Sequence, residues 1–355
     1  MQIMKTQNPL GRLPAEYEAQ GAVLLAFPHG RGDWAPWLAE VQACYVGMIK
    51  AIARHARTIV LADDAPSVRA RLMAAGVPEA RLTVQPLIFD DTWIRDYGPI
   101  TLVDGTSRPT LLDFGFNGWG LKYPSPDDNQ ATRRLHAAGV FGRAPLATQG
   151  LILEGGSIES DGQGTILTTA ACLLSPNRNP HLVRAGIEAE LARTLGATRV
   201  LWLEHGHLEG DDTDAHVDTI VRLCPDDTLA YVRCEDANDS HFQEFAALEA
   251  ELRLLRTAAG KPFRLVPLPW AAARYDADDG HRLPATYANF LIINHAVLVP
   301  TYGEPARDAA AVAAVQSAFP GWPVEGVDCS ALILQHGSLH CATMQVPPEV
   351  WSWNP

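Results

Sequence analysis

The stretch Gly210-Asp211-Asp212-Thr213-Asp214-Ala215-His216-Val217-Asp218 places four carboxylates and one imidazole within nine residues. Apolar residues follow it, so we expect an acidic loop that runs into a strand. Residues two apart in an extended strand project to the same side, which would place the His216 and Asp218 side chains on one face. This pattern is typical of a site for a cation, and such a site needs partners from elsewhere in the chain.

The bulk composition narrows the class of protein. A chain of 355 residues that is 47% apolar can bury a large core. The formal net charge of −13, without a Lys/Arg cluster, argues against nucleic acid and weakly favours small cationic ligands. Residues 1–11 show no signal-peptide pattern, and no window has the length of a membrane span. The six cysteines are scattered without paired spacing, so we predict a reducing, cytoplasmic location.

A recurring order of elements organises the chain: a helix, a strand, a polar loop, and two strands joined by a tight turn. Apolar periodicity predicts helices at residues 33–56 (capped by Asp33), 67–75 (ended by Gly76), 128–138, 181–195, 240–259 and 306–318. Strands are predicted at residues 22–27, 58–62, 82–89, 100–103, 110–114, 151–153, 199–203, 217–224, 229–234, 263–268, 287–293, 296–299, 324–327 and 342–346.

The two ends of the chain complete this pattern. The last strand lacks a partner in its own unit, and the strand at residues 22–27 could supply it. A period of roughly fifty to sixty residues with such closure predicts a circular array of similar units around one axis. An ordinary mixed α/β sheet is the alternative.

Titratable residues fall repeatedly in the segment between the strand and the hairpin. In a ring these segments would converge on one end of the axis and assemble a single site. Each residue also has a purely structural interpretation, as a salt bridge at a turn, a charge at a strand end, a core histidine or a buried thiol. The residues concerned are Arg95, Asp96, Glu154, His216, Asp218 and Cys341.

The chemistry that needs this set is attack on a cationic planar carbon. Asp96 and Asp218 can hold the two flanks of a guanidinium by paired hydrogen bonds. The Cys341 thiolate can then approach the carbon perpendicular to its plane. His216 can donate a proton to the leaving ammonia and later activate a water, while Glu154 orients the imidazole and raises its pKa.

Several motifs carry a resemblance to a known family. The sequence resembles agmatine deiminases and the bacterial-type peptidyl-arginine deiminases grouped with them, in the acidic loop ending at Asp218, in His340-Cys341, and at residues 13–18 (LPAEYE), 90–99 (DDTWIRDYGP), 114–120 (FGFNGWG), 153–157 (LEGGS), 174–180 (LSPNRNP) and 287–292 (YANFLI).

This resemblance implies the five-bladed α/β propeller of the guanidine-modifying pentein superfamily, as one domain over residues 1–355 with a central active site. It carries the family's catalytic residues onto Cys341, His216, Glu154, Asp96 and Asp218. No metal and no organic cofactor are implied.

The sequence also departs from the family pattern. Gln335-His336-Gly337-Ser338-Leu339-His340 stands where the family usually has Gly-Gly-Gly-Asn-Ile-His. Asp212 and Ala215 replace a Glu and a Gly of the acidic loop, and Tyr97, Leu25 and Phe27 are further departures. The substrate is therefore less well determined than the type of reaction.

Agmatine, converted to N-carbamoylputrescine and ammonia, is the substrate that the resemblance favours. Trp93 and Trp119 could pack its carbon chain or cover the cation, and Asp212 or Asp214 could meet its distal ammonium. The polar loop at residues 271–286 is long enough to be a lid. The partner we expect is thus a small cationic guanidino substrate, and the oligomeric state stays open, a homo-oligomer included.

Other functions remain open at this stage. Arginine, peptidyl-arginine or another guanidine could be the substrate, although a cytoplasmic location argues against protein-bound arginine. An amidinotransferase would pass the group to an amine instead of water, and a binding protein would have an inactive site. A metal-dependent hydrolase would use His205, His207, Glu209, Asp211 and His216, but would leave Cys341 without a role.

Overall fold

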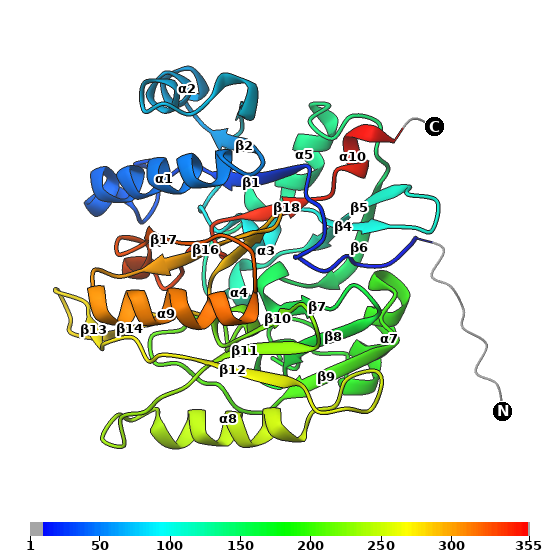
Figure 1. Cartoon of the computed structure of the whole chain (residues 1–355). Coiled ribbons are helices and arrows are strands. Elements are labelled where there is room, and N and C mark those ends of the chain that lie inside the picture. The colour runs from blue at the N-terminus through cyan, green and yellow to red at the C-terminus, as the bar shows by residue number, and fades with distance from the viewer. Residues whose placement is uncertain (1–9, 354–355) are drawn as a thin grey trace.

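The computed structural model describes residues 10–353, so most of the 1–11 stretch predicted to lack a signal sequence lies outside the described residues. Five sheets of similar construction surround a common centre, and the long helices cover their outer sides (Figure 1). The predicted five-bladed α/β propeller is thereby confirmed, and the alternative of one mixed sheet is wrong.

Four of the sheets share one topology. Each begins with an antiparallel hairpin, and a third strand then pairs in parallel with the second strand of that hairpin. These sheets are β4 (Ile100–Val103), β5 (Pro109–Gly115) and β6 (Leu146–Ile152); β7 (Ile158–Ser160), β8 (Thr165–Thr169) and β9 (Arg199–Leu203); β10 (Val221–Cys224), β11 (Thr228–Val232) and β12 (Arg264–Leu268); and β15 (Leu291–Ile293), β16 (Ala296–Thr301) and β17 (Val324–Asp328).

The fifth sheet joins the two ends of the described chain. Its strands, in spatial order, are β18 (Met344–Val346), β1 (Ala22–Ala26), β2 (Arg57–Ala62) and β3 (Leu82–Pro86). β1 and β18 pair antiparallel, with Ala22 opposite Val346. They take the place of the hairpin in the other sheets, as the sequence pattern predicted.

Helices connect the parallel strands. The longer ones are α1 (Leu38–Ala53), α2 (Ala65–Ala74), α5 (Ala131–Ala137), α7 (Arg184–Leu195), α8 (Phe242–Leu254) and α9 (Pro305–Ala318). Asp64 caps α2 by accepting a hydrogen bond from the Ser67 amide, and α7 ends at Gly196, whose φ of 72° suits glycine. Within residues 10–353, none of the helices combines the length and the apolar character that a bilayer crossing requires.

The remaining elements are short. They are α3 (Ile94–Tyr97), α4 (Gly118–Leu121), α6 (Ala170–Leu173), α10 (Glu349–Ser352), the hairpin β13 (Arg274–Tyr275) and β14 (Arg282–Leu283), and the 3-10 turns η1 (Ala35–Trp37), η2 (Glu79–Arg81), η3 (Asp128–Gln130), η4 (Gly155–Ser157), η5 (Val217–Thr219) and η6 (Leu332–Gln335).

Three predicted details are wrong. The predicted strand at 217–224 begins only at Val221, because residues Val217–Thr219 form the η5 turn. The strand predicted at 287–293 is confined to Leu291–Ile293. Asp33 caps no helix, since η1 precedes α1 and Trp37 occupies the N-cap position of α1.

The strand pairing places the polar loops between neighbouring sheets. The last strand of each sheet pairs with the hairpin that precedes it in the chain. The segment after that last strand therefore crosses to the next sheet. Asp96 lies between β3 and β4, Glu154 between β6 and β7, His216 and Asp218 between β9 and β10, and Cys341 between β17 and β18. All five predicted catalytic residues therefore occupy crossings between sheets.

Candidate active site

A cavity of about 430 Å³ collects residues from several of these crossings. Asp96 and Cys341 lie at its wall together with the rings of Trp93 and Trp119. Further along, its lining is acidic and aromatic, with Asp33, Trp37, Asp91, Tyr123, Asp212 and His336. Both a thiol and a set of carboxylates thus face one space that a small molecule can enter.

Cys341 is held in the turn just before β18. Its sulfur lies 3.8 Å from Asp218 Oδ2 and accepts a hydrogen bond of 3.1 Å from Asn289 Nδ2. Asn289 Oδ1 accepts from the backbone amides of His340 and Cys341 at 2.8 and 3.2 Å. Burial and the charges of Asp218 and Asp96 raise the pKa of the Cys341 thiol well above its usual value, although Asn289 and the Ser338 backbone oppose the rise.

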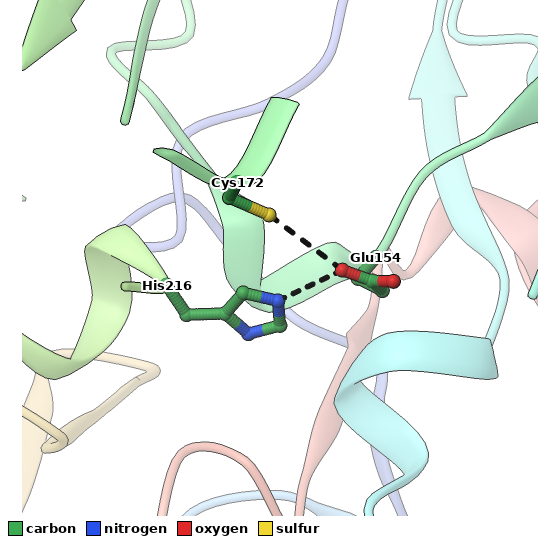
Figure 2. A group of neighbouring side chains, drawn as sticks. All are labelled: Glu154, Cys172 and His216. Atoms are coloured by element: carbon green, nitrogen blue, oxygen red, sulfur yellow. Dashed lines mark hydrogen bonds and ion pairs between the residues drawn. The ribbon is translucent and has the colours of Figure 1, made fainter. Parts of the chain in front are cut away.

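His216 and Glu154 form a fully buried pair. His216 Nε2 lies 2.9 Å from Glu154 Oε2 (Figure 2), and Arg178 Nε donates to both oxygens of the same carboxylate at 2.9 and 2.8 Å. The Cys172 thiol lies 3.7 Å from Glu154 Oε2. Burial raises the pKa of Glu154, but His216 and Arg178 outweigh it and the pKa is lowered. Because Nε2 is occupied by Glu154, Nδ1 is the ring nitrogen left to meet a ligand.

The two predicted flanking carboxylates differ in their surroundings. Asp96 accepts from Trp119 Nε1 and from the Gly156 amide, both at 2.9 Å, and burial raises its pKa to about 6. Asp218 Oδ2 lies 2.6 Å from His340 Nδ1. Burial raises the pKa of Asp218, but the hydrogen bond and charge of His340 outweigh it and the pKa is lowered.

Two buried polar atoms beside Cys341 and Asp96 have no hydrogen-bond partner among residues 10–353: Asp218 Oδ1, and His216 Nδ1, which lies 3.7 Å from Asp96 Oδ1. A buried polar atom without a hydrogen bond is costly, so the pair indicates a place where a ligand supplies the missing bonds. A free acceptor on Asp218 and a free ring nitrogen suit a ligand that carries several N–H donors.

Gly156 keeps this space open. A Cβ atom at this position would lie 2.7 Å from His216 Nδ1, 2.9 Å from Asp96 Oδ1 and 3.1 Å from Asp218 Oδ2. The same three measurements show that the imidazole and both carboxylates converge on one point beside Gly156, although they come from two other loops.

The residues predicted to bind the rest of the substrate divide into two groups. Trp93, Trp119 and Asp212 line the cavity. Asp214 is absent from its lining, because its carboxylate pairs with Lys122 at 2.8 Å and with Arg178 at 2.6 Å. Asp212 is thus the better placed of the two carboxylates that we expected could meet a distal ammonium.

The metal cluster weighed as an alternative does not assemble within the described residues. His205 Nδ1 lies 3.4 Å from Glu244 Oε2 on the surface, whereas His216 is fully buried against Glu154. None of the groups with metal-ligand spacing in residues 10–353 combines His205 or His207 with His216. The geometry gives no support to a metal-dependent hydrolase built on these residues.

Sequence reasoning assigned no role to several residues that hold or line the site. Asn289 fixes the nucleophile loop, Arg178 fixes Glu154, and Asp33 and Asp91 line the cavity. His340 lies between Asp218 and Glu16, with Glu16 Oε2 at 2.6 Å from Nε2. Asn289 and Arg178 belong to motifs that carried the family resemblance, so their position in a motif was the one available signal.

A thiol, an imidazole and three carboxylates at the centre of a five-bladed α/β propeller are the arrangement of a guanidine-modifying hydrolase. Residues 12–347 match the family described as Porphyromonas-type peptidyl-arginine deiminase. The chain belongs to this family.

Individual relatives agree with that assignment. The agmatine deiminase of Stutzerimonas stutzeri is 33% identical over 94% of this chain and 95% of its own length. A candidate arginine deiminase of Porphyromonas gingivalis is 49% identical with a TM-score of 0.87, covering 94% of this chain and 98% of that one. A cysteine-to-serine variant of the C. jejuni agmatine deiminase, solved with substrate bound, is 33% identical with a TM-score of 0.85, covering 94% and 95%.

Proposed function

We propose that the protein is a thiol-dependent deiminase that converts agmatine to N-carbamoylputrescine and ammonia. The observation that carries this proposal is the unpartnered Asp218 Oδ1 beside the Cys341 thiol and the free Nδ1 of His216. A guanidinium placed between Asp96 and Asp218 satisfies the free acceptor and presents its carbon to the sulfur.

The first half of the reaction forms a covalent bond. The bound cation lowers the pKa of Cys341, which burial and the two aspartates otherwise raise, so the thiol releases its proton to solvent as substrate binds. The sulfur attacks the guanidinium carbon and gives a tetrahedral intermediate. His216 gives its Nδ1 proton to the leaving nitrogen, the carbon–nitrogen bond breaks, and ammonia departs from an S-alkylthiouronium.

In the second half of the reaction His216 changes from proton donor to proton acceptor. Neutral His216 takes a proton from a water molecule, and the oxygen attacks the thiouronium carbon. The carbon–sulfur bond then breaks and the hydroxyl proton is lost to solvent, which releases the neutral ureido product and restores the thiolate. Glu154 acts on both steps through the 2.9 Å contact to His216, because it fixes the ring and favours the imidazolium.

The acidic part of the cavity lining favours agmatine over free arginine. Asp33, Asp91 and Asp212 line it, and its lining contains no Lys or Arg that could pair with an α-carboxylate. A second ammonium is attracted there, whereas a carboxylate is repelled. Trp93 and Trp119 line the same cavity as these carboxylates and Cys341, and we propose that they pack the carbon chain.

A panel of guanidino compounds tests this assignment. Purified protein is incubated with agmatine, arginine, a peptidyl-arginine and an alkylguanidine that lacks the second ammonium, and the products are identified by mass. We expect a ureido product and ammonia with agmatine above all, and a much larger KM for the alkylguanidine. Cys341→Ala should abolish turnover. Product that appears only when an amine acceptor is added would show an amidinotransferase instead.

Two further assignments belong to this proposal. Among the described residues all six cysteines are free thiols, which supports a reducing cytoplasmic location. The loop at residues 271–286 contains the β13–β14 hairpin, and His281 stacks on the cavity residue His336 at 5.3 Å between ring centroids. We propose that this hairpin covers the cavity as a lid.

A further inference from the structure

A buried chain of charged side chains begins at Asp218 and extends through the ring of His340. His340 Nδ1 lies 2.6 Å from Asp218 Oδ2, and His340 Nε2 lies 2.6 Å from Glu16 Oε2. Arg222 Nη2 donates to the same Glu16 oxygen at 2.8 Å, and Arg222 Nε donates to Glu159 Oε1 at 2.7 Å. These charges meet only in the folded ring, because Glu16, Glu159, Asp218 and His340 are far apart in the sequence.

Both ring nitrogens of His340 are placed to donate. An ionised carboxylate only accepts hydrogen bonds, so a nitrogen 2.6 Å from one of its oxygens carries a proton. The alternative is a bare Nε2 that accepts from Arg222 Nη2 at 3.0 Å. That assignment would place two acceptors, Nε2 and the Glu16 oxygen, 2.6 Å apart, where they repel each other. The distances therefore favour an imidazolium.

The balance of buried charge favours the same assignment. Within residues 10–353, Arg222 is the one arginine or lysine whose side chain pairs with any of the carboxylates of Asp218, Glu16 and Glu159. Buried charges are costly unless they are paired, so a second cation among three carboxylates is favourable. Burial raises the pKa of Glu16, but the charges of His340 and Arg222 outweigh it and the pKa is lowered. Glu16 is thus the acceptor in its contact with His340, and the proton belongs to the ring.

The contact between Glu16 and His340 is held at both ends by other parts of the fold. The Ile292 amide donates to Glu16 Oε1 at 2.7 Å, while Glu16 Oε2 accepts from Arg222. The His340 amide donates to Asn289 Oδ1 at 2.8 Å. Neither the carboxylate nor the backbone that carries the ring is free to turn away.

We propose that His340 is a positioning residue that carries a proton on both ring nitrogens, and that Glu16 holds this charge in place behind Asp218. The imidazolium occupies Asp218 Oδ2, so that the unpartnered Oδ1 is the oxygen left for the guanidinium. Its charge also keeps Asp218 ionised before substrate arrives. This role rests on the proposed function, because it concerns how Asp218 captures the substrate. Glu16 thereby belongs to the active site without touching the ligand.

Nitrogen-15 NMR of the full-length protein, labelled at histidine, tests the charge without any need for activity. Nitrogen shifts distinguish a protonated ring nitrogen from a bare one, and the signals lost in His340→Asn identify the ring. We expect protons on both nitrogens at neutral pH in the unmodified protein. If His340→Asn fails to fold, Glu16→Gln identifies the same ring by the shift of its Nε2 signal. A bare Nε2, with the proton on Glu16, would overturn the proposal.

The effect on substrate capture is measured by the pH dependence of kcat/KM. Glu16→Gln removes the charge that holds the His340 proton, so Asp218 loses the cation that keeps it ionised and takes up a proton at higher pH. We expect KM for agmatine to rise several-fold with a smaller change in kcat, and the acid limb of kcat/KM to move to higher pH. The other charged groups around Asp218 are His216, Asp96 and Arg222, and they are unchanged in this variant.

Glu159→Gln is the matched control. Glu159 is also a buried carboxylate that pairs with Arg222, and its printed partners, Arg222 and the Leu223 amide, do not include His340. Its loss should lower stability in a similar way and leave the acid limb in place. Equal acid limbs in the two variants would overturn the link from Glu16 to Asp218. A protein inactive on every guanidino compound would instead refute the proposed function, and the NMR result would still decide the charge of His340.

Discussion

The fully buried ring of His216 faces carboxylates from two other loops, and these favour its positively charged form. Burial lowers the pKa of the imidazolium, but the charge of Asp96, the Cys172 thiol and the hydrogen bond to Glu154 together raise it well above the usual value. The surroundings of the ring therefore favour the imidazolium over the neutral imidazole. It is then ready to donate to the leaving ammonia in the proposed reaction.

Replacing Glu154 by Gln should move the pH dependence of the reaction. The substitution removes a negative charge 2.9 Å from Nε2, so the pKa of His216 falls. Since the imidazolium is the proton donor, kcat is lost as the pH rises through that pKa. We expect the alkaline limb of the kcat profile to move to lower pH, together with a lower kcat at its maximum.

Glu159→Gln is the matched control for this change. Glu159 is also a buried carboxylate that pairs with an arginine, Arg222, at 2.7 Å, and it makes no contact with His216. It should lower stability in a similar way and leave the alkaline limb in place. If both variants gave the same profile, the assignment of that limb to His216 would be wrong.

Asn289 should set the reactivity of the thiol before substrate binds. Its side chain donates to Cys341 Sγ at 3.1 Å, and this contact opposes the rise in the thiol pKa. In Asn289→Ala, alkylation of Cys341 by iodoacetamide should need a higher pH, and kcat should fall roughly tenfold for the loss of a hydrogen bond to a charged group.

Asn179→Ala is the matched control, because it also removes a buried asparagine whose side chain hydrogen-bonds the backbone. Asn179 bonds both backbone groups of Ile152, in a different loop. An equal pH shift in both variants would show that Asn289 acts on general loop order instead of on the sulfur.

At this scale the sequence predicted residue types better than contacts. Cys341, His216, Glu154, Asp96 and Asp218 could be named because their combination suits one chemistry. The residues that hold these side chains in place could not be predicted. Asn289 is separated from Cys341 by 52 residues and Arg178 from Glu154 by 24, and only the folded loops bring them together. The pairing of Asp214 with Lys122 and Arg178 could not be predicted, because a carboxylate in an acidic loop gives no sign of the cation that will pair with it.

At the scale of elements, the loops that join neighbouring sheets position the side chains of the candidate active site. η4 follows Glu154 and presents Gly156 to the meeting point of His216, Asp96 and Asp218. Such a close approach leaves no room for a side chain. We expect Gly156→Ala to fold but to bind substrate poorly, with KM raised roughly tenfold, the effect of about 1.4 kcal/mol in binding.

Gly150→Ala is the matched control, since a Cβ atom on this β6 residue would meet nothing within 4 Å. Its KM and kcat should equal those of the unmodified protein. Steady-state kinetics and a thermal melt on both variants separate a blocked site from a damaged fold. A Gly156→Ala enzyme with normal KM would show that the guanidinium does not occupy the space beside this glycine.

Element types followed from the sequence more reliably than their ends. β9 at Arg199–Leu203 matches its prediction at both ends, because a short apolar run has turn residues on either side. The η5 turn was missed, since Val217, Asp218 and Thr219 run directly into an apolar segment and look like the start of the strand that follows. That error left the site prediction intact, because the turn still directs His216 and Asp218 toward one point.

At the scale of the whole molecule, the ring is closed by segments from opposite ends of the chain. β1 is completely buried, and Leu24 lies opposite Met344 on β18 and beside Ile59 on β2. Cys341 lies three residues before β18, so the same closure fixes the proposed nucleophile. We therefore propose that the chain unfolds as one domain.

The variant Leu24→Ala tests whether the chain unfolds as one domain. Loss of a fully buried leucine should lower the free energy of unfolding by roughly 2–5 kcal/mol. If the ring is one cooperative unit, tryptophan fluorescence and far-ultraviolet circular dichroism should report the same shifted urea transition, and Cys341-dependent activity should disappear at the same urea concentration. Leu254→Ala is the control, since Leu254 on α8 is 75% exposed and its loss should leave the midpoint unchanged. A first transition that removes activity while most helical signal survives would show that the β1–β18 sheet unfolds separately, and that the active site depends on a closure weaker than the rest of the propeller.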